Sequence, residues 1–410
     1  MNREGEALQP TASAEAIEFD PFSDDFFDDP YDTYRALRDH APIYHSEKYD
    51  FYALSRHADV LAAHLDPGRF SSAYGLTVDM LLQKTRVDMN MMIMMDQPEH
   101  TQLRRMINQA FSRRTVEGLE PLVSGTVKSF LDALGQRSEF DLVADFAALF
   151  PVEVISAMLG VPGPDRQQIR HWVDAMLHRE AGSAQITSEG MVASLELATY
   201  LLDLVKEKRH RPDDRIISRL IEVSAIDTDG VERRLSDDDV AGFSVLIAGA
   251  GSETVTKLIG NGAALFEKWP AQWKLVLDDR GAIPGAVEEI LRFNPPSQYQ
   301  GRFTTEDAHL ESGTIPAGSP TLLLTGAATR DPRAFERADE FDISRGAHAA
   351  LAFGHGIHTC LGAWLARLES RVAFEEIRRR WPDFHVDLDR GVRVNMANVA
   401  GYSNLPFSTK

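Results

Sequence analysis

Ten consecutive residues hold the only cysteine of the chain: Phe353-Gly354-His355-Gly356-Ile357-His358-Thr359-Cys360-Leu361-Gly362. Apolar residues recur at helical spacing from Leu361 onward, so Cys360 is predicted to stand where a helix begins. Unpaired N–H groups at a helix start stabilise a thiolate, which is the form of cysteine that ligates a metal. Gly354 and Gly356 permit a tight loop, and Gly362 leaves room for a flat group against the first helical turn. The stretch therefore predicts a cysteine ligand on a loop.

Two other interpretations of this stretch need no flat cofactor. A lone cysteine is usually a small buried hydrophobe, and His355, His358 and Cys360 are residue types that also bind zinc. A phosphate-binding loop is disfavoured, because Gly354-x-Gly356 lacks a glycine three residues on and no strand-loop-helix pattern surrounds it.

The composition of the 410-residue chain limits its class. A net charge of −19 argues against nucleic acid as a partner, and 43% apolar residues are ordinary for a packed soluble protein. One cysteine excludes an internal disulfide and fits a reducing compartment. Because no apolar run of about 18 residues and no secretory signal are found, we expect a cytoplasmic protein without a membrane anchor. Residues 1–18 are small, polar and acidic and are expected to form a disordered tail.

One predicted helix is far longer than usual. Ser236-Asp237-Asp238-Asp239 is a capping signature, and helical pattern continues after it without proline as far as Pro270. In its middle stands Ala248-Gly249-Ala250-Gly251-Ser252-Glu253-Thr254, where each internal glycine costs about 1 kcal/mol relative to alanine. Such a local penalty indicates a functional distortion, in which small residues let a flat ligand approach the backbone. Close packing against another helix is the alternative.

The pattern Phe-Gly-x-Gly-x-His-x-Cys-x-Gly resembles the haem-binding loop of the cytochromes P450, the haem-thiolate monooxygenases. The resemblance extends from about Phe19 to the end of the chain. It implies a mainly α protein of the cytochrome P450 fold, with a large helical region and a small β-rich lobe, as a single domain over residues 19–410. It also implies haem b as cofactor, with Cys360 as the axial ligand of the iron and His358 as a donor to a propionate.

Other segments resemble parts of the family that contact the haem. His100 and Arg104 lie four residues apart on one predicted helical face after Asp96-Gln97-Pro98-Glu99, and the resemblance implies that both donate to propionates. An exposed basic helix face is the alternative for this pair. Arg302 resembles a strand arginine with the same role in the family. The resemblance further assigns five residues to the cofactor site: Phe353, Gly354, Gly362, Ala250 and Gly251.

The glycine-containing stretch of the long helix carries the expected catalytic residues. Ala250, Gly251, Glu253 and Thr254 match the family's oxygen-activating signature Ala/Gly-Gly-x-Asp/Glu-Thr. By this resemblance Thr254 hydrogen-bonds dioxygen and Glu253 relays protons to it.

The resemblance also implies a network of ion pairs with a structural role. Glu289-x-x-Arg292 is weak by itself, since such pairs are common on helix surfaces. Followed by Phe293-Asn294-Pro295-Pro296 and later by Arg345, it resembles the family's Glu-x-x-Arg helix and its partner arginine. Glu289, Arg292 and Arg345 are therefore expected to form a buried network that holds the cysteine loop in place.

The substrate pocket is expected partly in a methionine-rich stretch between residues 74 and 95 that has no clean period. Methionines serve either as core filler or as an adaptable binding wall, and both interpretations stay open here. The residues expected to line the pocket are Met92, Met94, Leu246, Ala250, Gln298, Val399 and Ala400.

The resemblance implies insertion of one oxygen atom from O₂ into a hydrophobic small molecule such as a terpenoid, lipid, steroid or polyketide-like compound. No flavin or iron–sulfur motif is found, so electrons are expected from a ferredoxin and its reductase with NAD(P)H. Arg105, Arg113 and Arg114 are the expected basic patch for an acidic ferredoxin, and a monomer is expected. Two alternatives are a peroxide-driven haem peroxygenase and a non-enzymatic haem gas sensor or carrier. Glu253 and Thr254 favour the monooxygenase, because neither alternative needs a proton relay.

Overall fold

The computed structural model describes residues 17–87, 89, 91–180, 182–183, 185–226, 231–346, 351–394 and 396–409. Of the predicted tail over residues 1–18, only Ile17 and Glu18 lie within the described residues. Ile17 packs against an aromatic cluster of the β-rich lobe.

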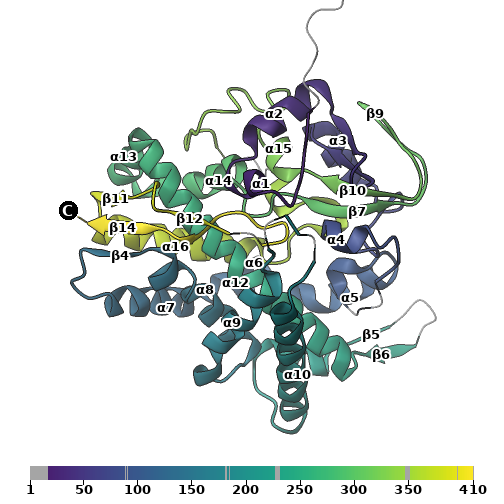
Figure 1. Ribbon diagram of the computed structural model, residues 1–410. Helices are drawn as coiled ribbons and strands as arrows, with labels where there is room; N and C mark the ends of the chain where they lie inside the picture. Colours follow the sequence, from purple (N-terminus) through teal and green to yellow (C-terminus); the bar gives the residue numbers. More distant parts are fainter. Residues whose placement is uncertain are drawn as a thin grey trace, which may run out of the picture.

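Helices dominate the structure, as Figure 1 shows. Their bounds are α1 (Asp24–Asp28), α2 (Tyr31–His40), α3 (His57–Leu65), α4 (Val78–Leu81), α5 (Glu99–Ile107), α6 (Arg113–Glu117), α7 (Glu120–Ala133), α8 (Phe150–Leu159), α9 (Arg166–Leu177), α10 (Ser188–His210), α11 (Ile216–Glu222), α12 (Asp237–Lys268), α13 (Pro270–Asp278), α14 (Ile283–Phe293), α15 (Thr325–Ala328) and α16 (Ala363–Arg380).

The strands form one larger sheet and several small ones. The five-stranded sheet has the order β1 (Ile43–Ser46), β2 (Phe51–Leu54), β10 (Ser319–Leu323), β7 (Gln300–Thr304), β3 (Phe70–Ser71). The smaller sheets are β11 (Phe384–Val386), β14 (Pro406–Thr409) and β4 (Glu139–Asp141); β12 (Val392–Arg393) with β13 (Tyr402–Asn404); β5 (Ser224–Ile226) with β6 (Glu232–Arg234); and β8 (Ala308–Leu310) with β9 (Gly313–Ile315).

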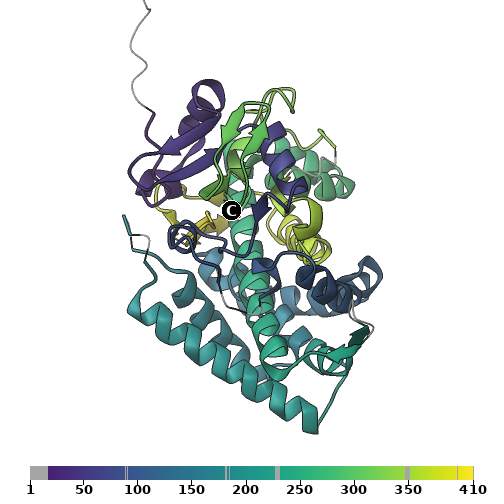
Figure 2. The same ribbon diagram turned by 90° about the vertical axis from the view of Figure 1, so that its right-hand side faces the viewer.

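The five-stranded sheet and the first helices make up the β-rich lobe. Only β10 and β2 pair in parallel, while the other neighbours in this sheet run antiparallel. An aromatic cluster joins the N-terminal segment to the sheet: Phe19 meets Phe26, Tyr34 and Phe51 at ring-centroid distances of 6.0 to 6.2 Å. Figure 2 shows this lobe lying above the helical region.

Helix α12 forms the centre of the helical region. The predicted capping box is confirmed, since the Ser236 Oγ accepts from the Asp239 N–H and the Asp239 carboxylate accepts from the Ser236 N–H. Most of α12 is buried, and α8, α10 and α16 pack along it (Figures 1 and 2). The prediction of a mainly helical chain with a small β-rich lobe is therefore confirmed. Among the described residues, no helix combines the length and the apolar character that crossing a bilayer requires.

Candidate active site

The loop before α16 holds Cys360 in a fixed position. The Cys360 N–H donates to the carbonyl of Phe353 at 2.8 Å, which closes the loop. Gly354 and Gly356 have φ of +64° and +67°, the left-handed region that favours glycine. The glycines predicted to permit a tight loop therefore have the backbone conformation that such a loop needs, and α16 begins three residues after the cysteine, at Ala363.

The Cys360 thiol is accessible and lies at the start of α16. Burial by the surrounding protein raises its pKa, against hydrogen bonds from the N–H groups of Gly362 and Ala363 and the charges of Arg104 and Arg367, which lower it. The N–H groups at the helix start thus lower the pKa of Cys360, as predicted, but desolvation raises it by more. A metal ion would displace the thiol proton, because only the thiolate ligates.

Near this loop, nitrogen-bearing side chains gather without a carboxylate partner among the described residues. The rings of His100 and His358 lie 4.2 Å apart, and His358 Nε2 is 3.1 Å from Ser72 Oγ. His100 is buried and neither of its ring nitrogens has a hydrogen-bond partner there. Arg302 is buried too, and its guanidinium donates to the adjacent Gly301 carbonyl.

The electrostatics of this cluster favour an anionic ligand. Burial and neighbouring positive charge lower the pKa of His100 to about 4 and that of His358 to about 2. Burial lowers the pKa of Arg302 to about 10. The two imidazoles are therefore neutral at neutral pH, whereas Arg302 stays charged. Because buried cations are normally paired, Arg302 suits a ligand that brings carboxylates, to which a neutral imidazole N–H can also donate.

The structure brings together the four residues that the sequence assigned to propionates. Arg104 completes the set, and its Nη2 donates to the Thr359 carbonyl at 2.6 Å, next to the cysteine. The sequence did not identify His64, which is buried beside Gly354 with no hydrogen-bond partner for either ring nitrogen among the described residues. Its place four residues after the buried Val60 on α3 was the only available signal.

The middle of α12 carries an accessible face although the helix is otherwise buried. Ala250 is exposed, and Leu246, Gly251 and Thr254 are half-buried. Leu246, Ala250 and Thr254 are spaced four residues apart and therefore share one face of the helix. Gly251 faces α8 instead, since a β-carbon on it would lie 2.9 Å from Cγ1 of Ile155. The alternative of close helix packing therefore holds at Gly251, while Ala250 lies on the accessible face.

Glu253 and Thr254 differ in their surroundings. Thr254 Oγ1 donates to the Ala250 carbonyl at 2.9 Å, so the hydroxyl lies on the accessible face. The Glu253 side chain is 3% exposed and pairs with Lys257 Nζ at 2.9 Å. The sequence analysis did not name Lys257, although its position four residues after a glutamate favours this pair.

The expected ion network is present in the structure. Glu289 and Arg292 make two hydrogen bonds of 2.7 and 2.8 Å, and Arg345 Nε lies 3.4 Å from Glu289 Oε1. Arg292 also donates to the carbonyls of Thr329 and Ala338. The network therefore ties α14 to the chain segments that lead to the cysteine loop.

Comparison with known proteins identifies the family. The Cytochrome P450 family model matches residues 282–399. The chain is 42% identical over 393 residues to the Putative cytochrome P450 123 of Mycobacterium tuberculosis (strain ATCC 25618 / H37Rv), covering 95% of this chain and 96% of that protein. The chain belongs to the cytochrome P450 family.

The chain is also similar to two further cytochromes P450, one in sequence and one in structure. The chain is 38% identical over 399 residues to the Vitamin D(3) 25-hydroxylase of Pseudonocardia autotrophica, covering 95% of this chain and 96% of that protein. The crystal structure of CYP109E1 from Bacillus megaterium in complex with corticosterone superposes with a TM-score of 0.81 at 29% identity, covering 93% of this chain and 98% of that one. The predicted family, fold and monooxygenase class are confirmed, and a cytochrome P450 uses a haem cofactor.

The residues present fit a haem. The exposed Cys360 suits an iron ligand, and the unpaired ring nitrogens of His100 and the buried guanidinium of Arg302 suit the carboxylates of a haem. The zinc alternative finds no support, because the described part of the chain contains no group of three or more His, Cys, Asp and Glu residues suited to a metal ion.

The expected substrate residues of this cytochrome P450 fall into two groups. Leu246 and Ala250 keep accessible surface on α12, whereas Met92, Met94, Val399 and Ala400 are buried. Gln298 needs a correction, because its side chain is bonded within the protein. Its Oε1 accepts from the Tyr34 hydroxyl at 3.2 Å and its Nε2 donates to the Pro295 carbonyl at 2.7 Å. Gln298 therefore joins α2 to the segment after α14 and does not present its amide to a ligand.

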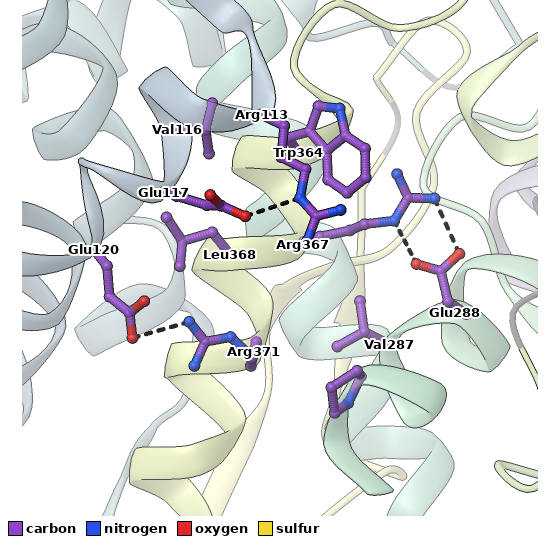
Figure 3. A pocket seen from close by; sticks show the side chains of 11 residues that line it. Arg113, Val116, Glu117, Glu120, Val287, Glu288, Trp364, Arg367, Leu368 and Arg371 are labelled. Atoms are coloured by element: carbon purple, nitrogen blue, oxygen red, sulfur yellow. Dashed lines mark hydrogen bonds and ion pairs between the residues drawn. The ribbon is translucent and has the colours of Figure 1, made fainter. Parts of the chain in front are cut away.

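A groove of about 460 Å³ lies beside the first turns of α16 (Figure 3). Its floor carries Trp364, 44% exposed, with the Arg113 and Arg367 guanidinium groups 5.2 and 5.7 Å from the indole ring. Figure 3 shows three ion pairs across or along the groove. They join Arg113 to Glu117, Arg367 to Glu288, and Arg371 to Glu120.

Proposed function

We propose that this cytochrome P450 is a haem b monooxygenase that inserts one oxygen atom from O₂ into a hydrophobic molecule of about steroid size, with residues 19–410 as one domain. Electrons come from a ferredoxin and its reductase, and the second oxygen atom leaves as water. The observation that carries the proposal is the combination of an exposed Cys360 with an acid and an alcohol next to each other on α12, the buried Glu253 and Thr254 on the half-open face.

The chain's own residues supply the binding site for the cofactor. Cys360 is the iron ligand, and His100, Arg104, Arg302 and His358 hold the propionates. When bound, the haem supplies the chemistry of dioxygen activation. Two anionic propionates would accept hydrogen bonds from these side chains, and the bonds from the two arginines would be strong charge-assisted interactions.

Thr254 and Glu253 have separate roles in the reaction. The Thr254 hydroxyl lies on the accessible face of α12 and can exchange its hydrogen bond to the Ala250 carbonyl for one to a ligand. Glu253 holds a carboxylate one residue away, paired with Lys257 in a site closed to solvent. Positioned acids of this kind deliver protons to a reacting group.

The substrate class is supported by the site and by the related proteins. The accessible residues on α12 are apolar or small apart from Thr254, and the buried Met92 and Met94 are adaptable apolar side chains. Vitamin D(3) and corticosterone, the compounds named for two related proteins, are both large, apolar and mostly carbon skeletons. A steroid-like compound is therefore the first candidate.

The groove beside α16 is the proposed docking site for the ferredoxin. Arg367 lies over the Phe353 ring at 4.5 Å, and the Phe353 carbonyl accepts from the Cys360 N–H, so the groove wall reaches the cysteine loop. The carboxylates in the groove are taken up by its own arginines. Arg105 and Arg114 are exposed nearby without an ion pair to a carboxylate of the described residues, which leaves positive charge for an acidic partner.

The test compares electron sources with purified protein. Product should form from a steroid-like substrate with ferredoxin, reductase and NAD(P)H, and peroxide alone should give little. The reduced protein with CO should show the red-shifted absorption of a thiolate-ligated haem, and Cys360→His should abolish that shift while haem remains bound. An unchanged CO spectrum in Cys360→His would refute the ligand assignment, and full activity with peroxide alone would replace the monooxygenase with a peroxygenase.

A further inference from the structure

A buried histidine lies against the cysteine loop from the side of the β-rich lobe. His64 belongs to the last turn of α3 and is 4% exposed. Neither of its ring nitrogens has a hydrogen-bond partner among the described residues. A buried polar group without a partner destabilises a folded chain, and native proteins pair nearly all such groups. The imidazole of His64 therefore suits a hydrogen-bonding ligand.

The backbone fixes the position of His64 against the loop. A β-carbon on Gly356 would clash with the His64 carbonyl, so the two backbones are in close contact. His64 Cε1 lies 3.7 Å from the place of a β-carbon on Gly354, which is an ordinary contact distance. The turn Gly356–His358 packs against α3, and His358 is an expected donor to a propionate. The His64 ring is thus held beside the turn that carries His358.

One other histidine has the same unpaired state. Among the described residues, His64 and His100 are the two histidines that are buried with both ring nitrogens unpartnered. His100 lies on α5, in the helical region, with its ring 4.2 Å from that of His358. His64 lies on α3, in the β-rich lobe. Segments far apart in the chain thus bring unpaired imidazoles to the same loop, which is expected where one ligand accepts hydrogen bonds from both.

The charged groups near His64 are cations. Burial, followed by the charges of Arg302 and His355, lowers the pKa of His64 to about 3, and no carboxylate of the described residues acts on it. The imidazole is therefore neutral at neutral pH and has one N–H to donate. Arg302 is buried as well and stays charged. A carboxylate is the acceptor that suits a buried arginine together with a neutral N–H donor.

We propose that His64 is a further contact for the carboxylates of the haem and donates one ring N–H to them from the β-rich lobe. The inference rests on the proposed function, which assigns these carboxylates to His100, Arg104, Arg302 and His358, and it adds a residue to that set. Arg302 of β7 and His64 of α3 then bind the cofactor from the β-rich lobe, while His100 and Arg104 of α5 bind it from the helical region. The haem would thereby join the two parts of the molecule. The role of His64 is binding and not catalysis.

The main test is His64→Leu, which removes both nitrogens and keeps a similar side-chain volume. Transfer of haem from the holoprotein to excess apomyoglobin should be at least about 10-fold faster than in the wild type, as expected for the loss of one hydrogen bond to a charged group. The red-shifted absorption of the reduced protein with CO should not change, because Cys360 remains the ligand. His64→Gln keeps an N–H donor and should restore most of the haem retention.

His57→Leu is the matched control on the same helix. His57 is half-buried in the first turn of α3, and its ring packs edge-on against Phe335 at a centroid distance of 5.5 Å. This variant should lose haem at the wild-type rate. The propionate bending vibrations in the resonance Raman spectrum are a second readout and should shift in His64→Leu but not in His57→Leu. If His64→Leu does not fold, His64→Met replaces it, because methionine adapts to irregular apolar space.

Haem dimethyl ester separates a contact with the carboxylates from a structural role of His64. Its propionates are methyl esters without negative charge, so the strong acceptor is removed. In protein loaded with the ester, His64→Leu should accelerate cofactor loss far less than it does with haem. An equal acceleration with both cofactors would mean that His64 stabilises the loop itself and would overturn the inference, as would haem loss at the wild-type rate in His64→Leu.

Failure of the proposed function has a different signature. A wild-type protein that holds haem but forms no product with ferredoxin, reductase and NAD(P)H would refute the monooxygenase. The haem transfer rates of the wild type, His64→Leu and His57→Leu would still decide whether His64 binds the carboxylates, because they are measured without turnover.

Discussion

The α-carbon of Gly356 lies so close to the backbone carbonyl of His64 that a β-carbon on Gly356 would come within 3.0 Å of that oxygen. Because the obstacle is backbone, a rotamer change of His64 cannot relieve it. Gly356 also has φ of +67°, so the close approach and the turn both require glycine. The end of α3 thereby fixes the position of the cysteine loop.

Gly356→Ala is therefore expected to destabilise the loop more than Gly354→Ala does. Gly354 is the matched control, since its φ of +64° carries the same penalty of roughly 1 kcal/mol, but a β-carbon there would lie 3.7 Å from the nearest atom. Overpacking should add about 1–3 kcal/mol at Gly356. Denaturant unfolding and haem retention measure the difference. Equal losses of unfolding free energy in the two variants would show that the His64 backbone shifts to make room for the β-carbon.

Glu289→Gln should cost about 3–5 kcal/mol of unfolding free energy, because it leaves the buried Arg292 guanidinium without its counter-ion. Asp32→Asn, which breaks the exposed pair between Asp32 and Arg35, is the control and should cost less than about 1 kcal/mol. Urea titration of both variants gives the comparison. Similar small losses would mean that Arg292 is held by its bonds to backbone carbonyls alone.

Thr254→Ala should keep substrate binding and electron uptake but lose product. The hydroxyl lies on the accessible face of α12, where a positioned proton transfer typically contributes about 10²–10⁴-fold. Thr256→Ala is the control on the same helix. Thr256 is buried, and its hydroxyl donates to the Ala147 and Ser252 carbonyls, so its loss should lower stability and not product per NAD(P)H. If Thr254→Ala formed as much product per NAD(P)H as the wild type, proton delivery would have to use another residue.

Glu369 predicts a dependence of stability on pH. This α16 residue is buried, neither carboxyl oxygen has a hydrogen-bond partner among the described residues, and burial raises its pKa well above the ordinary value. As the pH rises above about 4.3, the usual pKa of glutamate, the unfolded chain ionises while the folded chain keeps the proton, so folding weakens until the folded pKa is reached. Glu369→Gln removes this linkage.

The Glu369→Gln protein should therefore be more stable than the wild type at pH 7, by about 1.4 kcal/mol for each unit by which burial raises the pKa. This difference in unfolding free energy should disappear as the pH falls to 4. Unfolding curves at pH 4, 5.5 and 7 measure it. If the difference in unfolding free energy did not change with pH, the Glu369 carboxyl would have the same pKa in the folded and the unfolded chain.

Electron transfer tests the groove beside α16. Trp364→Ala combined with Arg113→Glu should slow reduction by ferredoxin, with a smaller effect at high salt, because exposed charges are screened. Substrate affinity should not change. Arg35→Glu, in an exposed ion pair on α2 of the β-rich lobe, is the charge-matched control. Reduction as fast as in the wild type at every ionic strength would place the docking site on another surface.

The sequence by itself identified the cysteine loop, the length and cap of α12, and the residues of the Glu289 network. Each of these depends on neighbours in the chain: glycines where φ is positive, a capping box at Ser236, or an acid and an arginine three residues apart on one helical turn. Such short-range patterns can be recognised without knowledge of the fold. For the same reason the family could be inferred before any tertiary contact was known.

Only the tertiary structure decided how distant segments meet. It places His64 against the cysteine loop and bonds the Gln298 side chain to the Tyr34 hydroxyl. It also shows that burial, more than the helix start, sets the pKa of Cys360. Partners, burial and desolvation depend on the packing of elements far apart in the chain, and no local pattern in the sequence records them.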